Sequence, residues 1–321
     1  MPSITKTLGA VVAGLAAFAS AAPGAPKLTR SQMKIHEVMK RQNQLAAAAG
    51  LTDLDILQFA LTLEHLETEF YRLGFQQFPA SDFQALGLSQ RQIDDLLKIG
   101  ETEESHVVLL QGALAQAGVQ PVQACQYNFG FTDAAAMVAT AAVLENVGVS
   151  AYAGAAQLLS DPGILTTAAT ILSVEARHQT FVRAATGVIA VPSAFDTPLS
   201  AKMVFSLAAP FITSCPEGSN LALTAFPSLA LAAGQDAAAL VAGSQVQLQS
   251  DQAAGAQFCG FTGAGLVGGT AFTAFDPAVG ACTVPQGLSG IVYVSITSAG
   301  PLSGVITDDI VLAGPMIMQV S

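Results

Sequence analysis

Residues 173–181 read SVEARHQTF and residues 99–110 read IGETEESHVVLL, and each stretch carries a glutamate three positions before a histidine. An apolar residue lies four positions before each glutamate and four positions after each histidine. Because steps of three and four follow one face of an α-helix, these glutamates and histidines take positions where a helical bundle buries its core. The repeated positions are Ile99, Glu103, His106 and Leu110, then Ile171, Glu175, His178 and Val182.

A second pattern repeats in the segments that precede these stretches. Residues 63–71 read LEHLETEFY and residues 144–152 read LENVGVSAY, and each places a tyrosine seven positions after a glutamate. The pairs are Glu64 with Tyr71 and Glu145 with Tyr152. The offset is 81 residues for this pattern and 72 for the Glu-x-x-His pattern. The chain therefore contains two copies of a helix pair, the first with a loop nine residues longer.

The isolation of Glu145 points to a metal site. It is the sole charged residue from Ala134 to Ser160, and a lone buried carboxylate is costly unless it is paired or bound to metal. Four glutamates and two Glu-x-x-His histidines are the ligand set of dinuclear iron and manganese sites in helical bundles. We therefore expect two divalent metal ions, Fe or Mn, with Zn as a further candidate. The alternative is a buried hydrogen-bond network of glutamate and histidine, including a site that has lost its metal.

Sequence signals place four helices between residues 52 and 190. Ser89 with Gln92 forms a capping-box pattern, and Asp161 followed by Pro162 suits a helix start. The expected helices run from Thr52 to about Arg72, from Ser89 to Gly118, from Thr132 to about Leu159 and from about Ile164 to Val188.

Beyond residue 191 the helical period gives way to alternation of polar and apolar residues, as in QVQLQ at 245–249 and IVYVSIT at 291–297. Short alternating strands with turn signals predict an antiparallel β-sandwich-like domain. The expected fold class is thus multidomain α and β, with a four-helix bundle over 51–195 and a β-rich domain over 196–321. The boundary is expected between 190 and 205, and residues 229–242 fit either a helix or a strand.

The N-terminal region indicates secretion. An apolar run at 8–19 followed by Ala19-Ser20-Ala21 predicts a signal peptide over 1–21. Residues 22–50 form a basic pro-segment or linker, in which Lys40-Arg41 is either a processing site or part of a linker. From residue 42 onward, six basic and 22 acidic residues give a net charge of −16, which disfavours nucleic acid and anionic membrane surfaces. No membrane span is expected.

The four cysteines, Cys125, Cys215, Cys259 and Cys282, match no zinc pattern. In a secreted chain they predict two disulfides, for which three connectivities are open. His65 lacks a partner at a useful spacing and is expected at the surface.

The motifs LEHLETEFY, ETEESH, LENVGVSAY and VEARHQTF resemble those of the secreted fungal ferritin-like proteins described as stress-response proteins, and are similar to plant desiccation-related proteins. The tail motifs SGIVYVSIT and DDIVLAGP also resemble the fungal members. The resemblance implies a four-helix ferritin-like bundle, without an established reaction. Carried over by residue, the metal ligands are Glu64, Glu103, His106, Glu145, Glu175 and His178. Glu67, one helical turn from Glu64, is a candidate to replace or assist it.

Two functions follow as hypotheses. The first is a secreted dinuclear metal protein that reacts with O₂ or peroxide, in which Tyr71 and Tyr152 either assist the site or pack as ordinary core aromatics. The second is a non-catalytic protective or structural protein, associated with the cell wall or extracellular matrix, with a structural or lost metal site. A homo-oligomer is compatible with both.

Overall fold

The computed structural model describes residues 51–219, 223–237, 240–263, 266 and 268–320. The predicted signal peptide at 1–21, the basic segment 22–50 and the Lys40-Arg41 pair lie outside the described residues.

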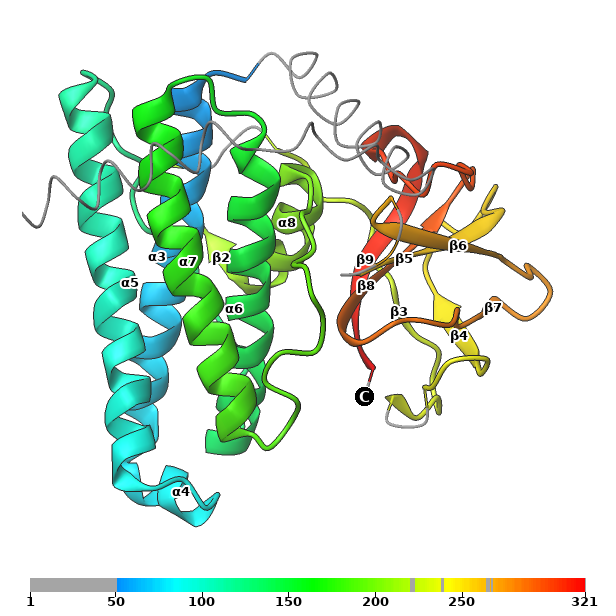
Figure 1. Ribbon diagram of the computed structural model, residues 1–321, viewed down its shortest axis with the longest axis horizontal. Coiled ribbons are helices and arrows are strands. Elements are labelled where there is room, and N and C mark those ends of the chain that lie inside the picture. Colours follow the sequence, from blue (N-terminus) through cyan, green and yellow to red (C-terminus); the bar gives the residue numbers. More distant parts are fainter. Residues whose placement is uncertain (1–50, 220–222, 238–239, 264–265, 267, 321) are drawn as a thin grey trace, which may run out of the picture. The chain divides into compact units, whose positions relative to one another are not determined.

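Four long helices form a bundle, as the sequence predicts (Figure 1). The helix α3 packs on α5, and α6 packs on α7, so that each predicted helix pair is also a packed pair. Ser89 and Gln92 form the capping box of α5, and Asp161 caps α7 with Pro162 as its first residue, which confirms both predicted starts. The helices are α3 (Asp53–Gln77), α5 (Gln90–Gln116), α6 (Ala134–Ala156) and α7 (Pro162–Ala185), with the short α4 (Ala80–Ala85) between the first two.

The first helix continues past the glycine that was expected to end it. The prediction that α3 ends near Arg72 is wrong, because the helix runs through Gly74 to Gln77. Gly74 is buried, and a Cβ atom there would lie 2.3 Å from Cε of Met137 on α6. This glycine therefore permits close helix packing instead of terminating a helix.

The C-terminal region contains two antiparallel sheets, in agreement with the predicted fold class. One has the order β3-β4-β7 and the other β6-β5-β8-β9, and a third, two-stranded ladder pairs β1 with β2. Val246 and Leu248 of β4 are buried while their neighbours are exposed, which confirms the predicted alternation. The strands are β1 (Gln126–Tyr127), β2 (Ile212–Ser214), β3 (Ala230–Leu231), β4 (Gln245–Gln249), β5 (Phe258–Thr262), β6 (Thr270–Ala274), β7 (Ala281–Thr283), β8 (Gly290–Thr297) and β9 (Val311–Val320). Residues 229–242, left open by the sequence, contain the short β3 within their described part.

A short helix that the sequence did not predict joins the two regions. The helix α8 (Ala201–Ala208) contacts α6 and also β9, and its N-cap is Ser200. Tyr293 of β8 adds a polar connection, because its hydroxyl lies 2.5 Å from Nδ2 of Asn146 and 3.0 Å from Oγ of Ser150, both on α6. The bundle and the larger sheet consequently share one hydrophobic core.

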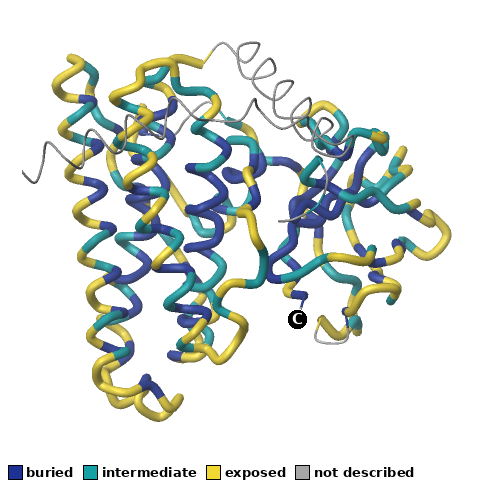
Figure 2. Tube along the Cα trace, viewed as in Figure 1, coloured by how far each residue is buried: buried dark blue, intermediate teal, exposed yellow. Residues whose placement is uncertain are grey.

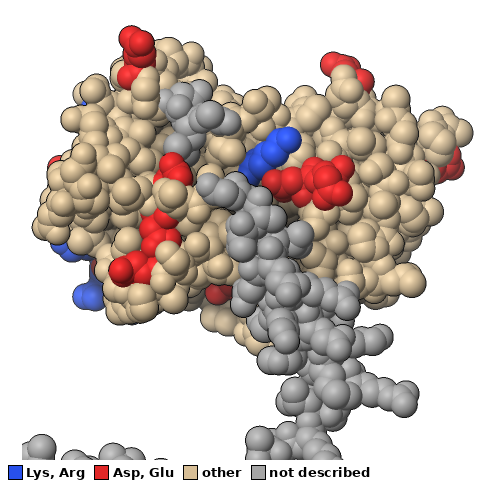
Figure 3. Space-filling view, turned by 90° about the horizontal axis from the view of Figure 1, so that it is seen from above, with Lys and Arg blue, Asp and Glu red and all other residues tan. Residues whose placement is uncertain are grey.

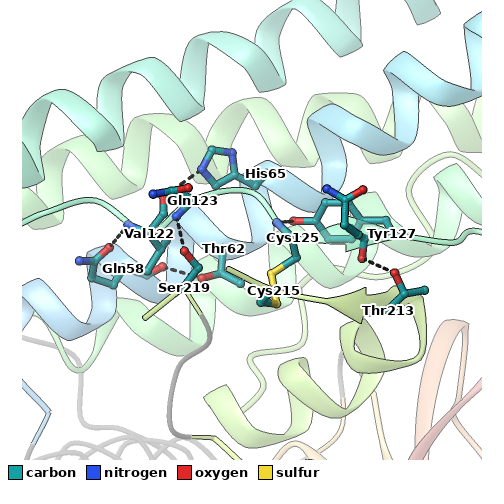
Figure 4. The surroundings of a disulfide bond; sticks show 11 residues. Gln58, Thr62, His65, Val122, Gln123, Cys125, Tyr127, Thr213, Cys215 and Ser219 are labelled. Atoms are coloured by element: carbon teal, nitrogen blue, oxygen red, sulfur yellow. Dashed lines mark hydrogen bonds between the residues drawn. A yellow bond between two sulfur atoms is a disulfide. The ribbon is translucent and has the colours of Figure 1, made fainter. Parts of the chain in front are cut away.

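The structure selects one of the three disulfide connectivities: Cys125 with Cys215, and Cys259 with Cys282. The second bond joins β5 of one sheet to β7 of the other. The first fixes the segment between α5 and α6, which covers His65 (Figure 4). His65 is therefore buried, with Nε2 donating to the Val122 carbonyl oxygen at 3.2 Å, and its predicted surface position is wrong.

Two features concern possible partners: the charge of the surface and the apolar character of α6. One face of the molecule is mostly uncharged, with scattered acidic groups and few basic ones (Figure 3). Among the described residues, α6 alone is long and apolar enough to cross a membrane, with a mean hydropathy of 1.5. Since 61% of its most apolar 18-residue stretch is buried inside the protein, α6 has the character of a core helix.

Candidate metal centre

The six predicted ligands converge in the middle of the bundle. Each of its four helices contributes, with Glu64 on α3 and Glu145 on α6 facing the two Glu-x-x-His pairs on α5 and α7. All six side chains are buried, and each of the four helices carries buried residues (Figure 2). Spacing alone thus identified a set of polar residues that the fold places in its core.

These residues form two overlapping groups whose ligand atoms lie within 4.8 Å of one another. One group contains Glu64, His106, Glu103 and Glu175, and the other contains Glu145, His178, Glu103 and Glu175. Both groups therefore share the glutamates of the two Glu-x-x-His motifs. Each group offers carboxylate and imidazole donors, which can hold a metal ion such as Fe, Mn or Zn.

The imidazoles face carboxylates of both helix pairs. Nδ1 of His106 lies 3.0 Å from Glu103 and 3.2 Å from Glu64. Nδ1 of His178 lies 2.7 Å from Oε1 of Glu103 and 3.3 Å from Oε2 of Glu145. Both rings therefore present Nδ1 to the centre of the cluster.

Thr102 sets the tautomer of His178. Its hydroxyl donates to the carbonyl oxygen of Ile99 at 2.7 Å, so its oxygen is free to accept from Nε2 of His178 at 3.0 Å. This contact keeps a proton on Nε2, so a cation that displaces the second ring proton would meet the Nδ1 lone pair, which faces the Glu103 carboxylate. The position equivalent to Thr102 in the other helix pair is Val174, 72 residues on. Sequence reasoning missed Thr102, although this difference between the copies was visible.

The two tyrosines connect the copies crosswise. The hydroxyl of Tyr71 donates to Oε1 of Glu145, and that of Tyr152 donates to Oε1 of Glu64. Each tyrosine thus holds the glutamate of the other helix pair, and both tyrosines are buried. They also pack in the hydrophobic core, and their assistance to a metal site stays a prediction.

A fifth buried carboxylate, that of Glu67, has no counterpart in the second helix pair. Glu67 is 4% exposed, and its equivalent 81 residues on is Gly148. A Cβ atom at Gly148 would lie 2.5 Å from Oε2 of Glu175 and 3.1 Å from Oε1 of Glu67. The absent side chain therefore makes room for both carboxylates. Glu67 belongs to neither group of converging ligand atoms, so it stands beside the cluster, with Glu64 inside it. Gly148 was missed, although it replaces the glutamate in the repeat.

Among the protein groups alone, the cluster is short of positive charge. Burial raises the pKa of Glu64 to about 7, and burial with neighbouring carboxylates raises the pKa values of Glu67 and Glu175 well above the ordinary range. Burial also raises the pKa of Glu145. Glu103 is the exception: burial opposes its ionisation, but two imidazoles outweigh this and lower its pKa to about 2.

Both histidines respond to the same excess of carboxylates. Burial disfavours their charged forms, but the surrounding carboxylates raise the pKa of His106 to about 12 and that of His178 to about 10. The cluster thus favours any positive charge placed among its carboxylates.

Unpartnered atoms indicate that the cluster fits a metal. Five buried atoms at its centre make no hydrogen bond of good geometry among the described residues, although all but Oε2 of Glu175 lie in imidazole–carboxylate contacts of 2.7–3.4 Å. They are Oε1 of Glu103, Oε2 of Glu145, both carboxylate oxygens of Glu175 and Nδ1 of His178. Buried polar atoms are otherwise almost always paired, and metal coordination satisfies acceptors of this kind.

Comparisons with known proteins agree with this arrangement. Residues 52–188 match the family model of the ferritin-like domain, so this part of the chain is a ferritin-like domain. Protein rds1 of Schizosaccharomyces pombe is 26% identical over 180 residues, which cover 56% of this chain and 44% of that protein. The chain therefore spans less than half the length of this relative. The domain match and the fungal relative confirm the resemblance to a fungal ferritin-like family.

A solved structure is also similar. The crystal structure of a conserved hypothetical protein, rv2844, from Mycobacterium tuberculosis has a TM-score of 0.36 and 21% sequence identity, and the match covers 44% of this chain and 96% of that one.

Proposed function

We propose that the ferritin-like domain of residues 52–188 binds two divalent metal ions, Fe or Mn. The observation that carries this proposal is the sharing of Glu103 and Glu175 by two buried ligand groups. Glu64 with His106 would complete one position, and Glu145 with His178 the other. Four carboxylates balance the charge of two divalent ions, and neutral imidazoles complete the donor set.

We further propose that the bound metals react with O₂ or hydrogen peroxide. When bound, two adjacent redox-active ions would supply the two electrons that convert O₂ to peroxide or peroxide to water, and an external reductant such as ascorbate would return them to the divalent state between turnovers. The chain holds these ligands in place: Tyr71 and Tyr152 fix Glu145 and Glu64, and Thr102 orients His178. Burial of the cluster keeps bulk water from it.

Secretion is part of the proposal. It is supported by the apolar N-terminal run of the sequence and by two disulfides, which persist in oxidising compartments. A role in stress response rests on the family resemblance.

The first test is the metal content of natively secreted protein, measured by elemental analysis before any metal is added. We expect about two ions of Fe or Mn per chain, since the ligand set is that of dinuclear sites. The variant Glu103→Gln should lose both ions, because both groups use Glu103. The matched control is Glu104→Gln, the exposed neighbour on α5, which should retain them.

The second test is consumption of O₂ and of H₂O₂ by the metal-loaded protein. Turnover that Glu103→Gln abolishes supports catalysis. A protein that binds metal, consumes neither oxidant and loses thermal stability when EDTA removes the metal is instead the non-catalytic, protective protein. Native protein without metal would contradict the dinuclear site itself.

A further inference from the structure

A small cavity of about 70 Å³ adjoins the carboxylate cluster. Its inner wall comes from α3 and α6, and its outer wall comes from α8, the 3₁₀ turn Ala209–Phe211 and β9, all of which lie outside the four-helix bundle. The outer wall consists of Leu207, Ala208, Phe211 and Ile317. The C-terminal region thus closes a space that the bundle alone would leave open.

The cavity meets the cluster at Gly148. This glycine lines the cavity, and the carboxylates of Glu175 and Glu67 approach it to within contact distance of a Cβ position. Any side chain at 148 would stand between the cavity and Glu175. Because Gly148 has no side chain, the cavity lies next to Glu175, a ligand that the two proposed metal positions share.

The lining decides what the cavity can hold. Glu67 is its one charged residue, and the other lining residues are aliphatic side chains, one phenylalanine and Gly148. Hydrogen peroxide both donates and accepts hydrogen bonds in water, whereas Glu67 is the polar side chain of this lining, so entry would leave part of the hydrogen-bonding capacity of peroxide unsatisfied at a substantial cost. Dioxygen has no donor and loses nothing on entering an apolar space. Apolar cavities bind small apolar molecules, and the wall of this cavity away from Glu67 is apolar.

We propose that this cavity is a binding pocket for dioxygen, shaped by α8 and β9, from which O₂ reaches the cluster beside Gly148. The inference rests on the proposed function and sharpens it, because it selects O₂ over peroxide as the co-substrate. It also gives the C-terminal region a role in the chemistry of the bundle.

The experiment separates the pocket from the metal chemistry. Xenon, an apolar probe, is bound to crystals of the full chain under pressure, with and without metal. Ala208→Val places two methyl groups into the cavity, and Ala201→Val, at the start of the same helix but outside the lining, is the matched control. If Ala208→Val folds poorly, as judged by its melting temperature, Ile317→Phe fills the cavity from β9.

We expect xenon in wild type and in Ala201→Val, and none in Ala208→Val. In the metal-loaded protein, Ala208→Val should raise the KM for O₂ by about tenfold or more, because the added methyl groups occupy the pocket. Metal content and the rate with H₂O₂ should stay unchanged.

Three results would each overturn the pocket while leaving the proposed function standing. They are the absence of xenon from the wild-type cavity, an unchanged KM for O₂ when the cavity is filled, and an equal loss of rate with H₂O₂. A wild-type protein that loads metal and consumes neither oxidant would overturn the proposed reaction, and the dioxygen assignment with it.

Discussion

Replacing Gly148 by alanine should damage metal binding while sparing the fold. The added Cβ would lie 2.5 Å from Oε2 of Glu175, whereas ordinary contact begins at 3.4 Å, so this oxygen must retreat by about 0.9 Å. Metal–ligand distances tolerate deviations of about 0.2 Å. The atom that must move is the end of a glutamate side chain, so the backbone of α6 can keep its place.

The size of each effect follows from this geometry. Alanine favours a helix interior over glycine by about 1 kcal/mol, which offsets the strain of moving a carboxylate. We expect the free energy of unfolding of the metal-free protein to change by less than about 1 kcal/mol. Metal affinity should fall by about 10–100-fold, the loss seen when the support of a ligand is disturbed.

The assay is a competition titration with a metal chelator, read beside a denaturant melt of the metal-free protein. Gly112→Ala is the control: Gly112 lies inside α5, is exposed and has no atom within 4 Å of its Cβ position. The control should gain helix stability and bind metal normally. Unchanged affinity in Gly148→Ala would refute the assignment of Glu175 as a shared ligand in this geometry.

Three further outcomes are expected. Thr102→Val should weaken metal binding by about 10–100-fold in calorimetric titration, because the hydroxyl oxygen orients the imidazole of His178. Thr102→Ser keeps the hydroxyl and should bind metal normally. Equal loss in both variants would count against this role. Tyr71→Phe removes the donor to buried Glu145 and should lower the free energy of unfolding by about 1–3 kcal/mol in urea melts of the metal-free protein; an unchanged midpoint would contradict the hydrogen bond. The double variant Cys125→Ala with Cys215→Ala opens a link across a sequence separation of 90 residues. The free energy of unfolding should fall by about 4–5 kcal/mol by the same method, and a loss that the variant Cys125→Ser with Cys215→Ser does not reproduce would point to the substitutions themselves.

The bundle and its cluster could be predicted because a helix has a fixed period. Glu103 and His106 lie on the stripe that also carries Ile99 and Leu110, so burial of the apolar residues carries the polar pair into the core. The repeat of this pattern at Glu175 and His178 then identified the second ligand pair. None of this required knowledge of contacts between distant segments.

Features that depend on pairs of distant residues could not be predicted. Glu64 and Glu67 lie one turn apart on the same helix, and the space that Glu67 occupies beside the cluster depends on Gly148 of another helix. His65 is buried because the segment that follows α5 covers it, held there by the disulfide of Cys125. The pattern of apolar residues on one helix does not reveal which loop will cover its opposite face.

The crossed hydrogen bonds of the two tyrosines bear on how such a chain can arise. Since Tyr71 holds Glu145 and Tyr152 holds Glu64, neither helix pair contains a complete site. An ancestor with a single helix pair would have needed a second copy of itself, related by a two-fold axis, to build the same cluster. A single chain can carry two halves that differ. They differ beside the cluster at Glu67 and Gly148: one copy has a carboxylate, and the other has no side chain, which leaves room for it.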